Sequence, residues 1–184
     1  MSKVIAFLGS PRKKGVSGRL VEQVLAGAKS AGAETVIYNL NDEGVKGCQG
    51  CDYCRTKDGC ATKDKLQPMY ADIKDADGIV AGFPIYFFNI GGQSKLLIDR
   101  LFPMLGEKFI PRHPGKNVVS VYAQGNDNKE AYKGAIEQND SFFKMFGWNL
   151  VDSILSFGGG HDLNYNIPQE LMERAYEAGK RLVK

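Results

Sequence analysis

The chain has 184 residues, of which 43% are hydrophobic, and its 24 Lys and Arg against 21 Asp and Glu give a formal net charge of +3. This composition is typical of globular proteins, which excludes a disordered or collagen-like chain and predicts one domain over residues 1–184. The basic residues are spread along the chain and cluster only at 12–14. We therefore expect no nucleic-acid partner.

Membrane-spanning segments are not predicted. The longest apolar segment, 78–92, contains Pro84 and Asn89 and is shorter than the roughly 20 residues that cross a bilayer. The amino terminus has a short apolar run at 4–9 followed by charge, which does not fit a signal peptide. We expect a cytoplasmic protein with no membrane partner.

The first part of the chain alternates strand and helix patterns. Val4–Leu8 is a continuous apolar run, typical of a strand that is buried on both faces. Ser17 is a suitable N-cap for the helix that follows. The apolar residues of that helix recur at helical spacing: Leu20, Val21, Val24, Leu25 and Ala28. Thr35–Leu40 is the second predicted strand.

The alternation continues to the end of the chain. The predicted strands are Gly78–Ile85, Val118–Tyr122 and Ile154–Phe157. The predicted helices are outlined by Leu66, Met69, Tyr70 and Ile73, by Leu96, Leu97, Ile98, Leu101 and Phe102, by Tyr132, Ile136, Phe143 and Phe146, and by Leu171, Met172, Ala175, Tyr176 and Leu182, with Pro168 in the first turn of the last. Five such units predict an α/β three-layer sandwich, with a five-stranded parallel sheet of order 2-1-3-4-5 and helices on both faces. Residues 106–116 are expected to form an exposed linker.

Ligands of such sheets bind beyond the carboxyl ends of the strands. The loop 9–19 after the first strand combines glycines with hydroxyls and a cationic side chain. Backbone N–H groups of such a loop and the following helix terminus can hold a phosphate, with Ser10, Arg12 and Ser17 adding side-chain hydrogen bonds. The loop lacks the glycine spacing of triphosphate and dinucleotide sites, which favours a mononucleotide. An ordinary glycine-rich turn is the alternative.

Three further loops are predicted to lie at the same edge. Residues 83–92 gather aromatic side chains and Asn89 at a strand end, where a flat heteroaromatic ligand fits, although core aromatics explain the pattern too. Gln124 and Gly125 follow the fourth strand, and residues 158–162 follow the fifth. His161 is interpreted as a solvated side chain rather than a catalytic one. His113 is expected to be exposed, and Trp148 to pack in the core.

Four cysteines lie within one segment, which we place at residues 44–65. Cys48, Cys51, Cys54 and Cys60 have the spacing C-x2-C-x2-C-x5-C. This run resembles the start of a ferredoxin motif, and it is too compact for the usual pairs of zinc ligands. Free or redox-active thiols remain an alternative, since C-x-x-C spacing lowers thiol pKa.

Five segments together resemble the NADPH-dependent FMN reductase family, specifically its iron-sulfur flavoprotein branch. They fall in consistent order at 9–12 with Ser17 and Leu20, 48–54, 76–78, 84–87 and 95–100. The resemblance implies a flavodoxin-like fold, bound FMN, and a homodimer or homotetramer. It also implies that the four cysteines hold one 4Fe-4S cluster.

The resemblance also implies which residues bind FMN. The phosphate-binding turn of the family falls on Ser10, Arg12, Ser17, Gly18, Arg19 and Leu20, and its flavin-edge turn falls on Pro84, Ile85, Tyr86 and Phe87. Two positions depart from the family pattern. Val16–Ser17 stands where the family often has Asn-Thr, and Phe83 is bulky where a small residue is usual, so a pocket of different shape is expected. Asp99–Arg100, also in the pattern, is interpreted as an ion pair on a helix surface or subunit interface.

These features predict a flavoprotein oxidoreductase that oxidises NAD(P)H and passes electrons, through the cluster when present, to a small-molecule or ferredoxin-type partner. No catalytic side chain is predicted, because a flavin carries the chemistry itself. Two alternatives stay open. One is a non-enzymatic electron carrier between ferredoxin-type partners, and the other is a redox-sensing FMN-binding module without a cluster.

Overall fold

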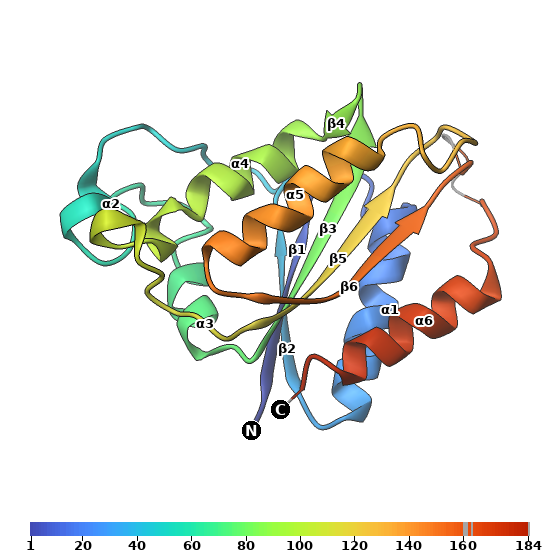
Figure 1. The fold of residues 1–184 in the computed structure, drawn as a ribbon, viewed down its shortest axis with the longest axis horizontal. Helices are drawn as coiled ribbons and strands as arrows, with labels where there is room; N and C mark the ends of the chain where they lie inside the picture. Colours follow the sequence, from blue (N-terminus) through green and yellow to red (C-terminus); the bar gives the residue numbers. More distant parts are fainter. Residues whose placement is uncertain (160–161, 163, 184) are drawn as a thin grey trace.

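A computed structural model describes residues 1–159, 162 and 164–183. Its centre is a twisted sheet with helices on both faces (Figure 1). The strands are β1 (Lys3–Leu8), β2 (Glu34–Asn39), β3 (Gly78–Tyr86), β4 (Asn89–Ile90), β5 (Asn117–Ala123) and β6 (Asn149–Ser156). The helices are α1 (Val16–Ser30), α2 (Tyr53–Thr56), α3 (Met69–Asp75), α4 (Gly92–Arg100), α5 (Lys133–Met145) and α6 (Gln169–Lys180), with 3-10 turns η1 (Phe102–Met104) and η2 (Glu107–Phe109).

The sheet has the order β2-β1-β3-β5-β6, and all four pairings along this path are parallel. The two-residue strand β4 lies off the path and pairs antiparallel with the end of β3. The remaining five strands therefore have the predicted order 2-1-3-4-5, and the predicted flavodoxin-like architecture is confirmed.

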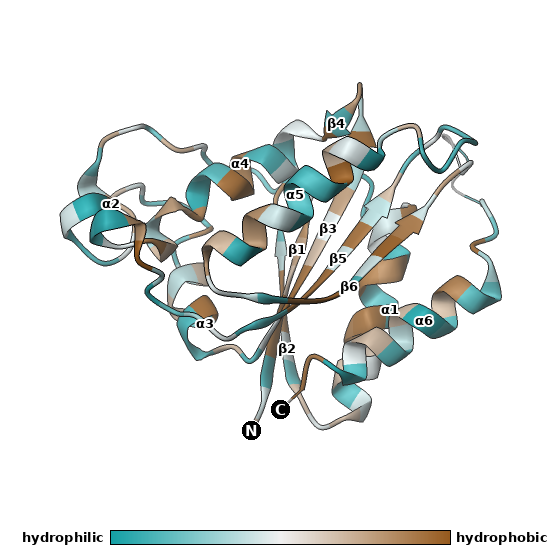
Figure 2. Ribbon diagram, in the orientation of Figure 1, coloured by the Kyte–Doolittle hydropathy of each residue, from teal (hydrophilic) through white to brown (hydrophobic). Residues whose placement is uncertain are grey.

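Alternate residues of each central strand enter different cores. Ile5 and Phe7 of β1 pack in the cluster that contains residues of α3, α4 and α5, whereas Val4 and Ala6 pack in the cluster that contains residues of α1 and α6. Both kinds of position are apolar because helices cover both faces. Hydrophobic residues accordingly follow the strands, whereas hydrophilic residues occupy much of the outward surface of α5 and α6 (Figure 2).

Several predicted element boundaries are wrong. Ser17 does not cap α1, because the helix already begins at Val16 and Gly15 occupies the N-cap position. Leu66 precedes α3, Tyr132 precedes α5, and Pro168 lies just before α6 rather than in its first turn. Leu101 and Phe102 lie beyond the end of α4. Leu66, Leu101 and Tyr132 still pack in or against the core, which is why apolar spacing alone extends the helices too far.

The last strand differs more from its prediction. β6 begins at Asn149 rather than Ile154, and a bulge shifts its register between Val118 and Val119 of β5. An edge strand tolerates polar residues, so its amino-terminal half lacks the apolar run that indicates a central strand. The linker 106–116 is not exposed throughout, because Lys116 is buried and donates to the carbonyls of Lys74 and Ala76. No helix among the described residues is both long and apolar enough to cross a membrane.

Candidate functional site

A cavity of about 540 Å³ lies beyond the carboxyl ends of four parallel strands. Its walls come from the segments that follow β1, end β3, follow β5 and end β6. The lining residues are Ser10, Arg12, Gly15, Val16, Ser17, Pro84, Ile85, Tyr86, Phe87, Ala123, Gln124, Gly125, Asn126, Tyr132, Ser156, Gly159 and Asp162. The sheet therefore brings together the loops that the sequence singles out.

The amino terminus of α1 opens into this cavity. Gly15, Val16 and Ser17 line the wall where the helix starts, and no side chain caps it within the described part of the chain. The first N–H groups of a helix have no intrahelical partner, and the helix dipole adds a partial positive charge there. The end of α1 is thus a suitable site for a phosphate.

The turn before α1 is held by its own hydrogen bonds. Ser10 Oγ accepts from the Arg12 N–H at 3.1 Å and contacts the Arg12 carbonyl at 3.2 Å, while the Gly15 N–H donates to that carbonyl at 2.9 Å. The turn then passes so close to α1 that a Cβ on Gly18 would lie 2.0 Å from the Lys13 carbonyl oxygen. Gly18 therefore shapes the turn without lining the cavity.

The opposite wall is the tight turn between β3 and β4. Tyr86 pairs with Asn89, so Phe87 and Phe88 form a two-residue connection, and their φ angles are 43° and 75°. Such turns favour Asn and Gly, because side chains are strained in the left-handed region. Phe87 and Phe88 are 95% and 67% exposed, and Phe88 makes an edge contact with Tyr132. The cavity rim therefore carries an exposed aromatic tip.

Two buried oxygen atoms on the third wall lack a partner. Gln124 donates from its amide nitrogen to the carbonyls of Asn126 and Asn128, but its Oε1 accepts no hydrogen bond from the described residues. Ser156 Oγ is likewise buried without a partner in that part of the chain. Both residues line the cavity. A buried polar atom without a partner is costly, so these two atoms indicate a polar ligand.

Nine of the thirteen residues predicted to bind the cofactor line this cavity: Ser10, Arg12, Ser17, Pro84, Ile85, Tyr86, Phe87, Gln124 and Gly125. Gly18, Arg19, Leu20 and Asn89 do not. Leu20 is fully buried in the core, and Arg19 Nη2 donates at 2.6 Å to the Tyr165 carbonyl. Asn89 lies beyond the reversed turn and lines a different groove. A role for any of these residues in cofactor binding stays a prediction.

The bulky Phe83 does not alter the cavity. Its side chain is completely buried and packs against Tyr122 at a ring-centroid distance of 6.1 Å. Phe83 does not line the cavity, whose lining on this strand begins at Pro84. The expectation that Phe83 changes the pocket shape is therefore wrong.

Two lining residues, Ser156 and Tyr132, carry a weak signal or none in the sequence. Ser156 lies inside a predicted strand, and Tyr132 has the spacing of a core residue. A small polar residue at the carboxyl end of a buried strand was the available indication for Ser156. For Tyr132 the sequence offers none, because its contact with Phe88 joins segments that are distant along the chain.

The four cysteines surround a second, smaller cavity of about 150 Å³. All four are free thiols; Cys48 and Cys51 are exposed, whereas Cys54 and Cys60 are half-buried. No three thiol, imidazole or carboxylate groups of the described residues converge tightly enough for one metal ion. A single zinc requires such convergence, whereas an iron-sulfur cluster distributes its thiolate ligands over several irons. Four thiols around one cavity are the kind of donor set that such a cluster takes.

The two inner thiols have opposite pKa shifts. Burial raises the pKa of Cys54, and the neighbouring thiols at Cys60, Cys48 and Cys51 add to this effect when they are charged. Burial also raises the pKa of Cys60, but hydrogen bonds from Thr62 and Tyr70 and the charge of Arg100 outweigh it, so the net pKa is lowered. All four thiols line the same cavity, so each lies within the electrostatic reach of its neighbours.

Arg100 does not pair with Asp99. Asp99 accepts from Lys95 at 2.6 Å on the helix surface, whereas Arg100 is 1% exposed and pairs with Asp64 at 2.7 Å. The expectation of a surface ion pair between the two neighbours is wrong, because adjacent helix residues point in different directions.

The remaining singular residues have mixed outcomes. Trp148 is buried and packs against Phe143 and Phe146, as predicted. His113 is half-buried rather than exposed, and burial lowers its pKa. His161 lies outside the described residues.

Comparison with known proteins identifies the family. The family model for NADPH-dependent FMN reductase matches residues 2–161. This chain belongs to that family. The match extends well past residue 100, where the resemblance visible in single motifs ends.

Relatives within the family include proteins named iron-sulfur flavoprotein. One from Methanocaldococcus jannaschii is 33% identical over 161 residues, covering 85% of this chain and 81% of its own. Another from Methanosarcina thermophila is 28% identical over 183 residues, covering 98% and 93%. Among solved structures, an NAD(P)H:quinone oxidoreductase from Methanothermobacter marburgensis has a TM-score of 0.70 at 18% identity, covering 98% of both chains. This last likeness shows the fold.

Proposed function

We propose that this chain is an FMN-dependent oxidoreductase in which the cavity of about 540 Å³ beyond the strand ends holds FMN. The observation that carries the proposal is the pair of unpartnered oxygen atoms, Gln124 Oε1 and Ser156 Oγ, in a cavity that also contains the uncapped end of α1. These features fit a ligand with a phosphate at one end and polar groups along its length. Family membership supports the same ligand.

The residues present suit the parts of FMN. The first N–H groups of α1, with Arg12, would hold the phosphate, and the segment Pro84–Phe87 would lie along the flavin ring. Bound FMN supplies hydride and single-electron chemistry. The protein contributes placement, and its aromatic rim at Phe87 and Tyr132 limits the access of water.

We further propose that Cys48, Cys51, Cys54 and Cys60 hold one 4Fe-4S cluster. The four thiols around a single small cavity support it, as do the names of the relatives. Such a cluster supplies one-electron transfer. The exposure of Cys48 and Cys51 leaves this end of the site open to a protein partner, which favours a ferredoxin-type acceptor and keeps the electron-carrier function as the second candidate.

A second copy of the chain is the proposed occupant of the groove between α4 and α5. The groove has a volume of about 750 Å³. Its lining includes Cys48 of the cysteine segment and Asn89 of β4. Apolar side chains such as Phe102, Phe142 and Met145 predominate in it. An open apolar surface of this kind is unusual on a monomer. The homo-oligomers implied by the family resemblance agree with it.

Anaerobic mixing with NADPH and with NADH tests the enzyme function. We expect the purified protein to be yellow and to contain iron and sulfide in equal amounts. We also expect NADPH or NADH to bleach the flavin. Bleaching by reduced ferredoxin but by neither nicotinamide would contradict the enzyme and support the electron carrier. A protein with no flavin, iron or sulfide after anaerobic purification would contradict both.

A further inference from the structure

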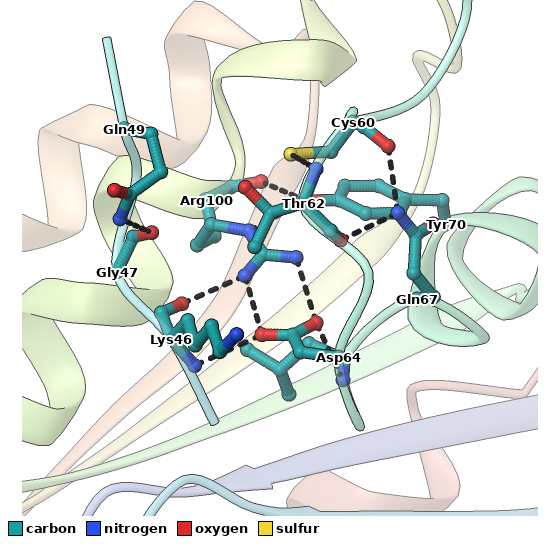
Figure 3. A network of polar contacts seen from close by, with 10 residues as sticks. Lys46, Gly47, Gln49, Cys60, Thr62, Asp64, Gln67, Tyr70 and Arg100 are labelled. Atoms are coloured by element: carbon teal, nitrogen blue, oxygen red, sulfur yellow. Dashed lines mark hydrogen bonds and ion pairs between the residues drawn. The ribbon is translucent and has the colours of Figure 1, made fainter. Parts of the chain in front are cut away.

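Arg100 is a buried cation at the carboxyl end of α4. Its guanidinium donates from Nη1 to Asp64 Oδ2 at 2.7 Å and from Nη2 to Asp64 Oδ1 at 3.0 Å (Figure 3). Nη1 also donates to the Lys46 carbonyl at 2.7 Å, and Nε donates to the Tyr70 hydroxyl at 3.0 Å. The side chains of Arg100 and Asp64 are both completely shielded from solvent.

The partners of Arg100 lie at the two ends of the cysteine segment. Lys46 is two residues before Cys48, and Asp64 is four residues after Cys60. Asp64 also accepts from the Lys46 N–H at 2.9 Å, so the two ends are joined directly as well as through Arg100. One side chain from α4 thus closes the cysteine segment into a loop.

A second contact reaches Cys60. The Tyr70 hydroxyl accepts from Arg100 Nε and donates to the Arg100 carbonyl, both at 3.0 Å, which fixes the guanidinium beside the cysteine segment. Gln67 donates to the carbonyls of Cys60 and Thr62, both at 2.6 Å, which fixes the backbone at this cysteine. Figure 3 shows these side chains converging on Arg100 and Cys60.

The network is more than a device for fold stability. A buried ion pair contributes little net stability, because desolvation offsets its attraction, and apolar residues often do as well. What the bidentate pair does provide is a fixed orientation between two segments. Arg100 also lines the cavity that the four thiols surround, so its position and theirs are set together.

We propose that Arg100 is a positioning residue of the cysteine site: by joining both ends of the cysteine segment to α4, it sets the spacing of Cys60 from the other three cysteines. This inference rests on the proposed cluster.

Arg100→Lys tests this inference, with Arg174→Lys as control, since Arg174 of α6 also forms an ion pair, with Asp152 of β6. Lysine keeps the charge but cannot make the bidentate contact. We expect Arg100→Lys to lower iron and sulfide content at least threefold at unchanged FMN content. Amide hydrogen exchange of residues 44–65 in protein stripped of iron should become at least threefold faster. Arg174→Lys should change neither.

The outcomes separate the inference from the proposed function. Wild-type protein without iron and sulfide would contradict the proposed cluster. Exchange in residues 44–65 would then still decide whether Arg100 holds the segment. Unchanged exchange and iron content in Arg100→Lys would overturn the role of Arg100, as would an equal acceleration of exchange in α1, which would indicate general unfolding.

Discussion

At the scale of single residues, the strongest ligand signal is polar atoms that the protein leaves without partners. Ser156 is 2% exposed and Gln124 is 4% exposed. Ser156 Oγ and Gln124 Oε1 nevertheless form no hydrogen bond with any described residue. Both come from the ends of neighbouring strands, β5 and β6. A fold that retains such atoms at the wall of a cavity is arranged to share them with a ligand.

Ser156→Ala should therefore weaken FMN binding without destabilising the flavin-free protein. Loss of one hydrogen bond to the ligand corresponds to about 0.5–1.5 kcal/mol, or roughly a 2- to 12-fold higher Kd. Ser120→Ala is the control, because Ser120 is buried in the same sheet but donates to Asp140 at 2.7 Å. We expect it to lower the free energy of unfolding and leave Kd unchanged. Equal Kd for wild type and Ser156→Ala would show that this hydroxyl does not contact the ligand.

At the scale of elements, the connection between β3 and β4 carries strain. Phe87 and Phe88 both have positive φ, and each such non-glycine residue costs about 1–3 kcal/mol. The double substitution Phe87→Asn and Phe88→Gly supplies the residues that this turn favours. It should raise the free energy of unfolding of flavin-free protein by about 1–2 kcal/mol, as measured with urea. Phe157→Asn, at an exposed position without positive φ, should give no gain.

Helix α6 is attached to β6 by an ion-pair network with a predictable pH dependence. Asp152 accepts from Arg174 at 2.5 Å and from Arg181 at 2.6 Å. Burial raises the pKa of Asp152, but the two arginines outweigh this and lower it overall. A lowered carboxyl pKa stabilises the fold at pH values above the unfolded pKa of about 3.9, and the contribution is lost as the pH falls through the folded pKa.

Asp152→Asn should thus lower the free energy of unfolding at pH 7 by about 0.5–1 kcal/mol, given that both arginines are half-exposed. The difference from wild type should shrink as the pH falls below about 4 and vanish once the pH is below the lowered folded pKa of Asp152. Urea unfolding at a series of pH values measures it. A difference that stays constant down to pH 2 would mean that the carboxylate charge is not responsible.

At the scale of the whole molecule, the groove between α4 and α5 carries exposed apolar side chains. Met145 is 50% exposed in the groove between α4 and α5, and Phe109 is 53% exposed there. We expect the protein to sediment as a dimer or larger assembly, and Met145→Asp to shift it toward the monomer. Ile37→Asp is the control, since Ile37 is 49% exposed on the edge strand β2, outside this groove. A monomeric wild type would contradict the proposed second copy.

Much of this architecture follows from local sequence. The buried runs in β1 and β3 are recognisable because a strand covered on both faces must be apolar throughout. The order of the sheet then brings the loops after β1, β3 and β5 together, which is why most predicted cofactor residues share a cavity. The edge strand β6 was harder to predict because its first half is half-buried and polar.

Long-range pairings were not predictable in this way. Arg100 and Asp64 are separated by 36 positions, and nothing in the spacing of either residue indicates its partner. Asn89 looked like a cofactor residue because it follows the aromatic segment, but the Phe87–Phe88 turn reverses the chain and moves it to another groove. Tertiary contacts decide such positions, and a single sequence contains little information on them.

Binding of FMN in the 540 Å³ cavity is tested most directly by titrating flavin-free protein with FMN and with riboflavin, following flavin fluorescence. The uncapped end of α1 and Arg12 predict one FMN per chain, bound at least tenfold more tightly than riboflavin, which lacks the phosphate. Equal affinity for the two flavins, or binding of neither, would contradict the claim that this cavity binds FMN through its phosphate.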